Sequence, residues 1–177
     1  MRKIVYYVAT SLDGFISGAD GDVSRFAYAG SAVDQYLEDL KTYDTVIMGR
    51  NTYEFGYQYG MQPGQKAYQH MEHYIFSNQL TFENPDDGVH VRSIDIKNVV
   101  ELKEQEGTDI YLCGGGEFAG WLLDYDLIDV LKIKLNPIVL GSGVGIFGSS
   151  VKALNLELIV SETYDQGVHI ITYQLKK

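Results

Sequence analysis

The chain has 177 residues, of which 45% are hydrophobic, and this is enough to bury one substantial core. Its formal net charge of -10 repels a phosphate backbone, so we expect no nucleic-acid partner. The only cysteine, Cys113, cannot form an internal disulfide, and no apolar stretch reaches the length of a membrane span. We therefore expect a single domain over residues 1–177, in a cytoplasmic protein that does not bind a membrane.

The first part of the chain alternates buried strands with helices. Residues 3–9 (KIVYYVA) are β-branched and aromatic without a turn residue, which predicts a buried strand, and a turn-rich stretch follows at 11–23. Residues 31–43 place apolar side chains at helical spacing, with Ser31 as the expected N-cap of an amphipathic helix. The run 45–50 (TVIMGR) predicts a second buried strand that leads into a short helix.

The alternation continues through the middle of the chain and then stops. Two strands, a helix, a third strand and a second helix are predicted at 73–77, 89–93, 95–106, 109–113 and 117–123. Alternation of this kind indicates parallel strands joined by crossover helices, and hence an α/β fold. The last third contains long strands at 130–140, 154–163 and 169–175, which predict an antiparallel ending to the sheet.

Three strand ends carry unusual chemistry, in the segments ATSLDG (9–14), GRNT (49–52) and CGGGE (113–117). Ligands of open α/β sheets bind outside the carboxyl ends of the strands. Two of these junctions open helices, whose first N–H groups and positive dipole ends favour an anion. The three consecutive glycines would also let a ligand approach the backbone closely.

Each of these patterns also has a purely structural interpretation. The glycine run satisfies G-x-G-x-x-A through Gly114, Gly116 and Ala119, but it comes late in the chain and no acidic residue follows at 130–140, so we reject a Rossmann site. The glycines could serve close helix–sheet packing alone. The GRNT segment could be a helix cap beside a surface arginine.

Taken together, the motifs resemble the dihydrofolate reductase superfamily, and within it a bacterial branch similar to the reductase domain of riboflavin biosynthesis. The matching segments are 8–17 (VATSLDGFIS), 46–54 (VIMGRNTYE), 111–123 (YLCGGGEFAGWLL) and 127–147. The resemblance implies a three-layer α/β/α fold with a mixed, mostly parallel eight-stranded sheet that ends in antiparallel strands. It also implies NADPH across the carboxyl ends and hydride transfer to a small heterocycle such as a pterin, a folate or a riboflavin-pathway pyrimidine.

The resemblance assigns the cofactor to residues at the three strand ends. Arg50 would hold the 2′-phosphate, and a cis peptide would join the first two glycines. The expected NADPH-binding residues are Ala9, Ile16, Gly49, Arg50, Asn51, Thr52, Ser77, Asn78, Gly114, Gly115, Gly116, Glu117 and Phe118.

Two carboxylates are the candidate catalytic residues. Asp34 lies near the position of the folate-reductase carboxylate, but Ser31-x-x-Asp34 also fits an N-terminal capping arrangement. Asp13 matches the SLDG segment of the riboflavin-type branch, although Asp-Gly is equally a common turn pair.

Other features bear on partners. The tyrosine-rich segment 53–60 could stack on a planar substrate. His70 and His73 lack the further ligands that a zinc site needs, so we expect no metal site. A homodimer is expected, because the riboflavin-type branch tends to pair and the long C-terminal strands expose an edge. The alternative to an enzyme is a sensor or scaffold that binds a nucleotide in the same cleft without turnover.

Overall fold

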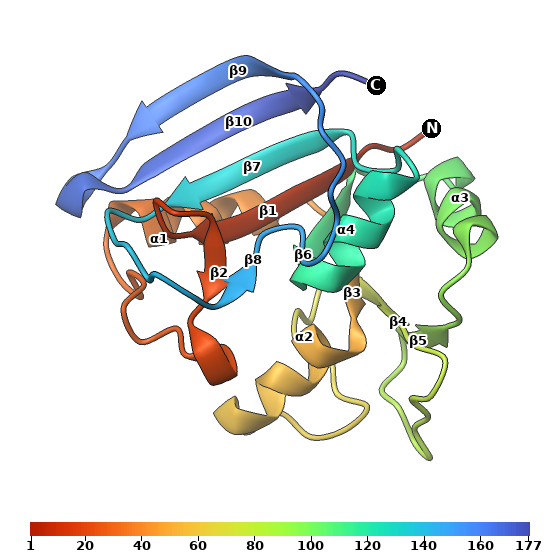
Figure 1. Ribbon diagram of the computed structural model, residues 1–177. Coiled ribbons are helices and arrows are strands. Elements are labelled where there is room, and N and C mark those ends of the chain that lie inside the picture. Colours follow the sequence, from red (N-terminus) through yellow and green to blue (C-terminus); the bar gives the residue numbers. More distant parts are fainter.

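The computed structural model describes residues 1–177 as an eight-stranded sheet covered by helices on both faces (Figure 1). The strands lie in the order β5-β4-β3-β6-β1-β7-β10-β9. Every neighbouring pair from β5 to β7 is parallel, and β10 pairs antiparallel with both β7 and β9. The expected mixed sheet with an antiparallel ending is therefore confirmed.

The strands of the large sheet are β1 (Ile4–Thr10), β3 (Thr45–Gly49), β4 (Glu72–Phe76), β5 (Val89–Arg92), β6 (Ile110–Gly114), β7 (Val130–Leu135), β9 (Leu156–Thr163) and β10 (His169–Leu175). The helices are α1 (Ser31–Leu40), α2 (Arg50–Phe55), α3 (Ile96–Glu104) and α4 (Gly116–Asp124). Short 3-10 turns lie at Ala19–Gly21, Gly56–Tyr59 and Asp165–Gly167. No helix combines the length and the apolar character needed to cross a bilayer.

The two faces of the sheet have separate cores because side chains alternate along each strand. On β1, Ile4 and Tyr6 pack with α3 and α4, whereas Val5 and Tyr7 pack with α1 and α2. The central strands are apolar on both faces, as a sheet between two helical layers requires.

Three details differ from the sequence expectation. Gly30, not Ser31, is the N-cap of α1, with a φ of 111°, and the Asp165 carboxylate accepts from the Ser31 N–H. The strand predicted at 130–140 ends at Leu135, since Pro137 has no N–H to continue the ladder. A second, two-stranded sheet also forms between β2 (Phe15–Ser17) and β8 (Val144–Gly145).

The buried His73 fastens the segment before β4. Its Nε2 accepts hydrogen bonds from the backbone N–H groups of Ala67 and Tyr68, each at 3.1 Å, and its Nδ1 lies 3.1 Å from the Met71 carbonyl. Only the neutral ring with a proton on Nδ1 satisfies all three contacts. Burial, the largest cause, lowers the pKa of His73 to about 4. His73 is thus structural.

The free energy of unfolding should depend on this ring between pH 6.5 and 4. The unfolded chain takes up the imidazole proton near pH 6.5 and the folded chain only near pH 4, so the stabilisation is complete above 6.5 and is lost as the pH falls. The loss is about 3 kcal/mol. Urea unfolding at several pH values should show this slope in the wild type and not in His73→Gln. The matched control, His169→Gln, should retain it, and an unchanged slope in His73→Gln would contradict the assignment.

Candidate functional site

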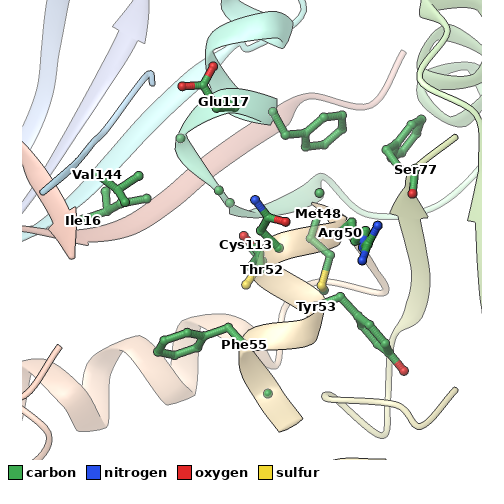
Figure 2. Close-up of a pocket in the computed structure, with 18 of the residues that line it drawn as sticks. Ile16, Met48, Arg50, Thr52, Tyr53, Phe55, Ser77, Cys113, Glu117 and Val144 are labelled. Carbon is green, nitrogen blue, oxygen red and sulfur yellow. The ribbon is translucent and has the colours of Figure 1, made fainter. Parts of the chain in front are cut away.

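A pocket of about 1040 Å³ lies across the carboxyl ends of β4, β3, β6 and β1 (Figure 2). The starts of α2 and α4 form part of its wall, and β2 and β8 close one side through Ile16 and Val144. Figure 2 shows this pair on the left of the pocket and Arg50 with Ser77 on the right. The long shape suits an extended ligand that touches several strand ends at once.

The glycine segment forms the middle of the pocket wall. Gly114 has a φ of 133°, and the peptide between Gly114 and Gly115 is cis, as the resemblance implied. A Cβ on Gly115 would lie 2.8 Å from the Thr52 hydroxyl, and a Cβ on Gly116 would lie 2.3 Å from the Gly145 carbonyl oxygen. Packing therefore disfavours a side chain at 115 and 116, and all three glycines line the pocket.

Both helix starts in this wall lack a side-chain cap. Gly49 precedes α2 and Gly115 precedes α4, and neither helix has a side-chain oxygen that accepts from its first N–H groups. Such groups carry a partial positive charge and prefer an anionic partner. The pair of helix starts with the glycine backbone between them fits a pyrophosphate.

One end of the pocket, which we call the Arg50 end, consists of Arg50, Ser77, Asn78 and Gln79. Arg50 donates from Nε to Glu54 at 2.9 Å and from a terminal nitrogen to the Gln79 side chain at 3.2 Å. These contacts span the gap between α2 and the turn after β4. With a side chain that is 42% exposed, the guanidinium remains accessible to a ligand.

The turn after β4 is built by its own polar side chains. The Ser77 hydroxyl accepts from the N–H groups of Gln79 and Leu80, and the Asn78 side chain accepts from the Ile94 N–H. A second cavity of about 550 Å³ adjoins this turn and is lined by Arg92. The sequence does not single out this second cation, because an arginine at the end of a short strand has no distinctive local pattern.

Another part of the lining, which we call the apolar end, is formed by Met48, Phe55, Met61, Tyr68 and Cys113. Figure 2 shows Met48, Cys113 and Phe55 around the same part of the cavity. Burial raises the pKa of the Cys113 thiol, so the sulfur stays protonated. This end can hold a flat, largely apolar ring.

The structure brings most of the sequence-predicted site residues into one pocket. Those that line it are Ile16, Gly49, Arg50, Asn51, Thr52, Ser77, Asn78, Gly114, Gly115, Gly116, Glu117 and Phe118. Ala9 is not among them, and its neighbour Val8 lines the pocket instead, because alternation along β1 turns the two side chains to opposite faces.

The two candidate catalytic carboxylates lie outside the pocket lining. Asp34 is exposed on α1. Asp13 accepts from the backbone N–H groups of Leu140 and Gly141 at 3.1 and 2.7 Å. Hydrogen bonds from Ser11 and then from these backbone groups lower its pKa to about 2. Asp13 therefore joins the loop after β1 to the loop after β7.

Comparison with known proteins agrees with this architecture. The family model of the RibD C-terminal domain matches residues 2–170. An uncharacterized protein of Bacillus subtilis (strain 168), YwjB, is 29% identical over 170 residues, which cover 96% of each chain.

Two solved structures share the fold. One, from Shewanella sp. PV-4 and named for riboflavin biosynthesis, aligns with a TM-score of 0.80 at 24% identity over 99% of both chains. The other is a dihydrofolate reductase of Enterococcus faecalis complexed with NADP(H), with a TM-score of 0.66, 20% identity, and coverage of 99% of this chain and 97% of that one.

The close contact at Gly116 makes this position intolerant of a side chain. Gly116→Ala should lower the free energy of unfolding by about 1–3 kcal/mol, because the new Cβ forces the backbone at Gly145 to move. Gly18→Ala is the matched control, since its Cβ would have no contact closer than 3.4 Å. Thermal unfolding measures both variants. Equal stability of the two variants would contradict this prediction, because it would show that the 144–148 loop can move away from the new Cβ without a cost in stability.

Proposed function

Because the chain belongs to the RibD C-terminal domain family, we propose that it is an NADPH-dependent reductase that transfers hydride to a small heterocyclic substrate. The family supports a reductase-like role. The observation that carries the proposal is the glycine wall between two uncapped helix starts, in a pocket that is lined by Arg50 and also by a group of apolar side chains. We further propose that the chain acts as a single domain in the cytoplasm.

The residues of the pocket fit NADPH along its length. The pyrophosphate would accept from the first N–H groups of α4 beside Gly115 and Gly116, where no side chain competes. Arg50 would take the 2′-phosphate, with Ser77 and Asn78 on the adenosine side. NADPH, when bound, supplies the hydride.

The substrate would occupy the apolar end. Its lining of Met48, Phe55, Met61, Tyr68 and Cys113 excludes water from one side of a planar ring and favours a pterin, a folate or a riboflavin-pathway pyrimidine. Ile16 would keep the opposite side of the pocket apolar.

One observation favours a second candidate, a nucleotide-binding sensor or scaffold without turnover. Neither Asp13 nor Asp34 lines the pocket, so the carboxylate chemistry expected from the sequence is missing from it. Absorbance of NADPH at 340 nm, followed with dihydrofolate, dihydrobiopterin and 5-amino-6-(5-phosphoribosylamino)uracil, separates the two functions. Steady oxidation with any of them supports the reductase, and tight NADPH binding without oxidation supports the sensor.

Nucleotide selectivity should depend on Arg50. The wild type should bind NADPH more tightly than NADH, and Arg50→Ala should reduce that preference roughly ten- to a hundredfold, the value of one charge-assisted contact to phosphate. Fluorescence titration with both nucleotides measures it.

Lys41→Ala serves as the control for removal of a positive charge. Lys41 pairs with Glu38 on α1, outside the pocket lining, and its loss should leave the preference unchanged. If Arg50→Ala weakened NADPH and NADH equally, Arg50 would have no role at the 2′-phosphate.

We also propose that a second copy of the chain covers the free edge of the sheet. All eight residues of β9 are exposed, including Leu158 at 57%, Ile159 at 56% and Val160 at 43%. An exposed apolar edge strand that also offers unpaired backbone groups is a strong site for self-association.

Sedimentation should therefore give twice the 19.8 kDa chain mass. Leu158→Lys should shift the protein to the monomer, because it places a charge in the buried edge. Leu37→Lys, at a position 52% exposed on α1, is the matched control and should remain dimeric. A wild-type monomer at all concentrations would exclude this assembly.

A further inference from the structure

The apolar end of the pocket is backed by a cluster of tyrosine hydroxyl groups. The hydroxyls of Tyr36 and Tyr111 lie 2.6 Å apart, and that of Tyr68 lies 3.7 Å from the Cys113 sulfur. The ring of Tyr68 meets the ring of Tyr111 edge-on, with centroids 5.8 Å apart at 73°. These four side chains come from α1, β6 and the segment before β4.

No carboxylate or imidazole reaches this end of the pocket. Glu117 is the only acidic residue in the lining, and it lies at the start of α4, where its carboxylate accepts from Ser149 at 2.7 Å. No histidine is in the lining. A reduction that also needs a proton must therefore take it from a neutral group or from water.

Tyr68 is the best placed of the neutral groups. Tyr53 also lines the pocket, but it donates its hydroxyl proton to the Gln65 carbonyl at 2.8 Å. Tyr68 has a sulfur as its close partner, and sulfur is a weak acceptor. A carbonyl oxygen or an imine nitrogen of a bound ring would be a better acceptor for the same hydroxyl.

The protein holds Tyr68 in place from behind. His73 accepts from the Tyr68 N–H, and the two rings stack with centroids 5.9 Å apart at 22°. The Tyr111 ring closes another side. A donor fixed by its backbone and by two rings loses little freedom when it meets a ligand.

The surroundings also keep the hydroxyl protonated. Burial raises the pKa of Tyr68 well above its ordinary value, as it does for Tyr111. The Lys134 ammonium lies 5.1 Å from the ring centre of Tyr36, at the far side of the cluster. This positive charge would stabilise the negative charge that develops on the hydroxyl groups when one of them gives up a proton.

We propose that Tyr68 is a catalytic residue that hydrogen bonds to the substrate and gives it the proton that accompanies hydride transfer, with Tyr111 and Tyr36 as positioning residues. This assignment rests on the proposed reductase function. As the carbon of a C=N bond accepts hydride, its π electron pair moves to nitrogen. Nitrogen takes the proton from Tyr68 Oη, and Tyr68 regains one from water.

Tyr68→Phe tests the proposal because it removes only the hydroxyl and keeps the ring between His73 and Tyr111. Its kcat, with the acceptor that the wild type reduces, should fall roughly 100-fold or more, the usual loss for a general acid. Its affinity for NADPH should be unchanged. Tyr43→Phe is the matched control: Tyr43 packs on Tyr111 with centroids 5.7 Å apart but does not line the pocket, so its kcat should be unchanged.

A binding measurement gives a readout that does not depend on turnover. Pteridine-2,4-dione, a neutral fluorescent ring with carbonyl acceptors, is titrated into the protein without nucleotide. Its affinity should fall roughly tenfold in Tyr68→Phe, the value of one hydrogen bond, and should not change in Tyr43→Phe.

The outcomes separate this assignment from the proposed function. Wild-type turnover with an undiminished kcat in Tyr68→Phe would overturn the role of Tyr68 and leave the reductase standing. Loss of kcat in Tyr43→Phe equal to that in Tyr68→Phe would also overturn it, because a general loosening of the core would then explain both. A wild type that oxidises NADPH with none of the acceptors would overturn the reductase itself, and the proton donor with it.

Discussion

The arrangement of the pocket depends on a close contact between α4 and the backbone of residues 145–148, which leaves no room for a side chain. At Gly116 and Gly120, a Cβ would lie 2.3 and 2.2 Å from the carbonyl oxygens of Gly145 and Phe147. The backbone of residues 145–148 therefore lies directly on α4. In the same segment, the Ile146 carbonyl accepts a hydrogen bond from the hydroxyl of the buried Tyr6 at 2.9 Å. The neighbouring strand β8 pairs with β2. One close backbone contact thus ties α4, β1 and the loop after β1 together around the glycine wall.

Glycine in the run 114–116 can serve close packing or ligand binding, and the sequence motif alone does not distinguish these two roles. Packing restricts Gly116 and Gly115 whether or not a ligand is present, whereas a Cβ on Gly114 would meet no atom closer than 3.6 Å. A triple glycine at the end of a strand is therefore partly an architectural feature and partly a ligand-binding one. The uncapped starts of α2 and α4 supply the independent reason to expect an anion there.

The sequence predicted the site best where its chemistry is local. Strand ends and helix starts are visible as apolar runs followed by glycine or polar residues, so the segments around Arg50 and Gly114 could be brought together by topology alone. Asp34 could not be placed in this way, because a small rotation of α1 decides whether a side chain faces the sheet or the solvent. Leu37, one of the apolar side chains at helical spacing on α1, is likewise 52% exposed. Tyr68 and the partners of Asp13 could not be predicted from the sequence for another reason. They lie on irregular segments whose contacts come from residues distant in the sequence.

Charge explains why neutral donors suit this pocket. The chain carries a net charge of -10, and a ligand with a pyrophosphate adds further negative charge beside the glycine wall. A buried carboxylate at the apolar end would meet that charge in a medium of low dielectric and would have to lose its own hydration. Tyrosine hydroxyls avoid both costs because they stay neutral and still donate hydrogen bonds. Arg50 could then act on the phosphates of such a ligand without an opposing carboxylate among the residues of the apolar end.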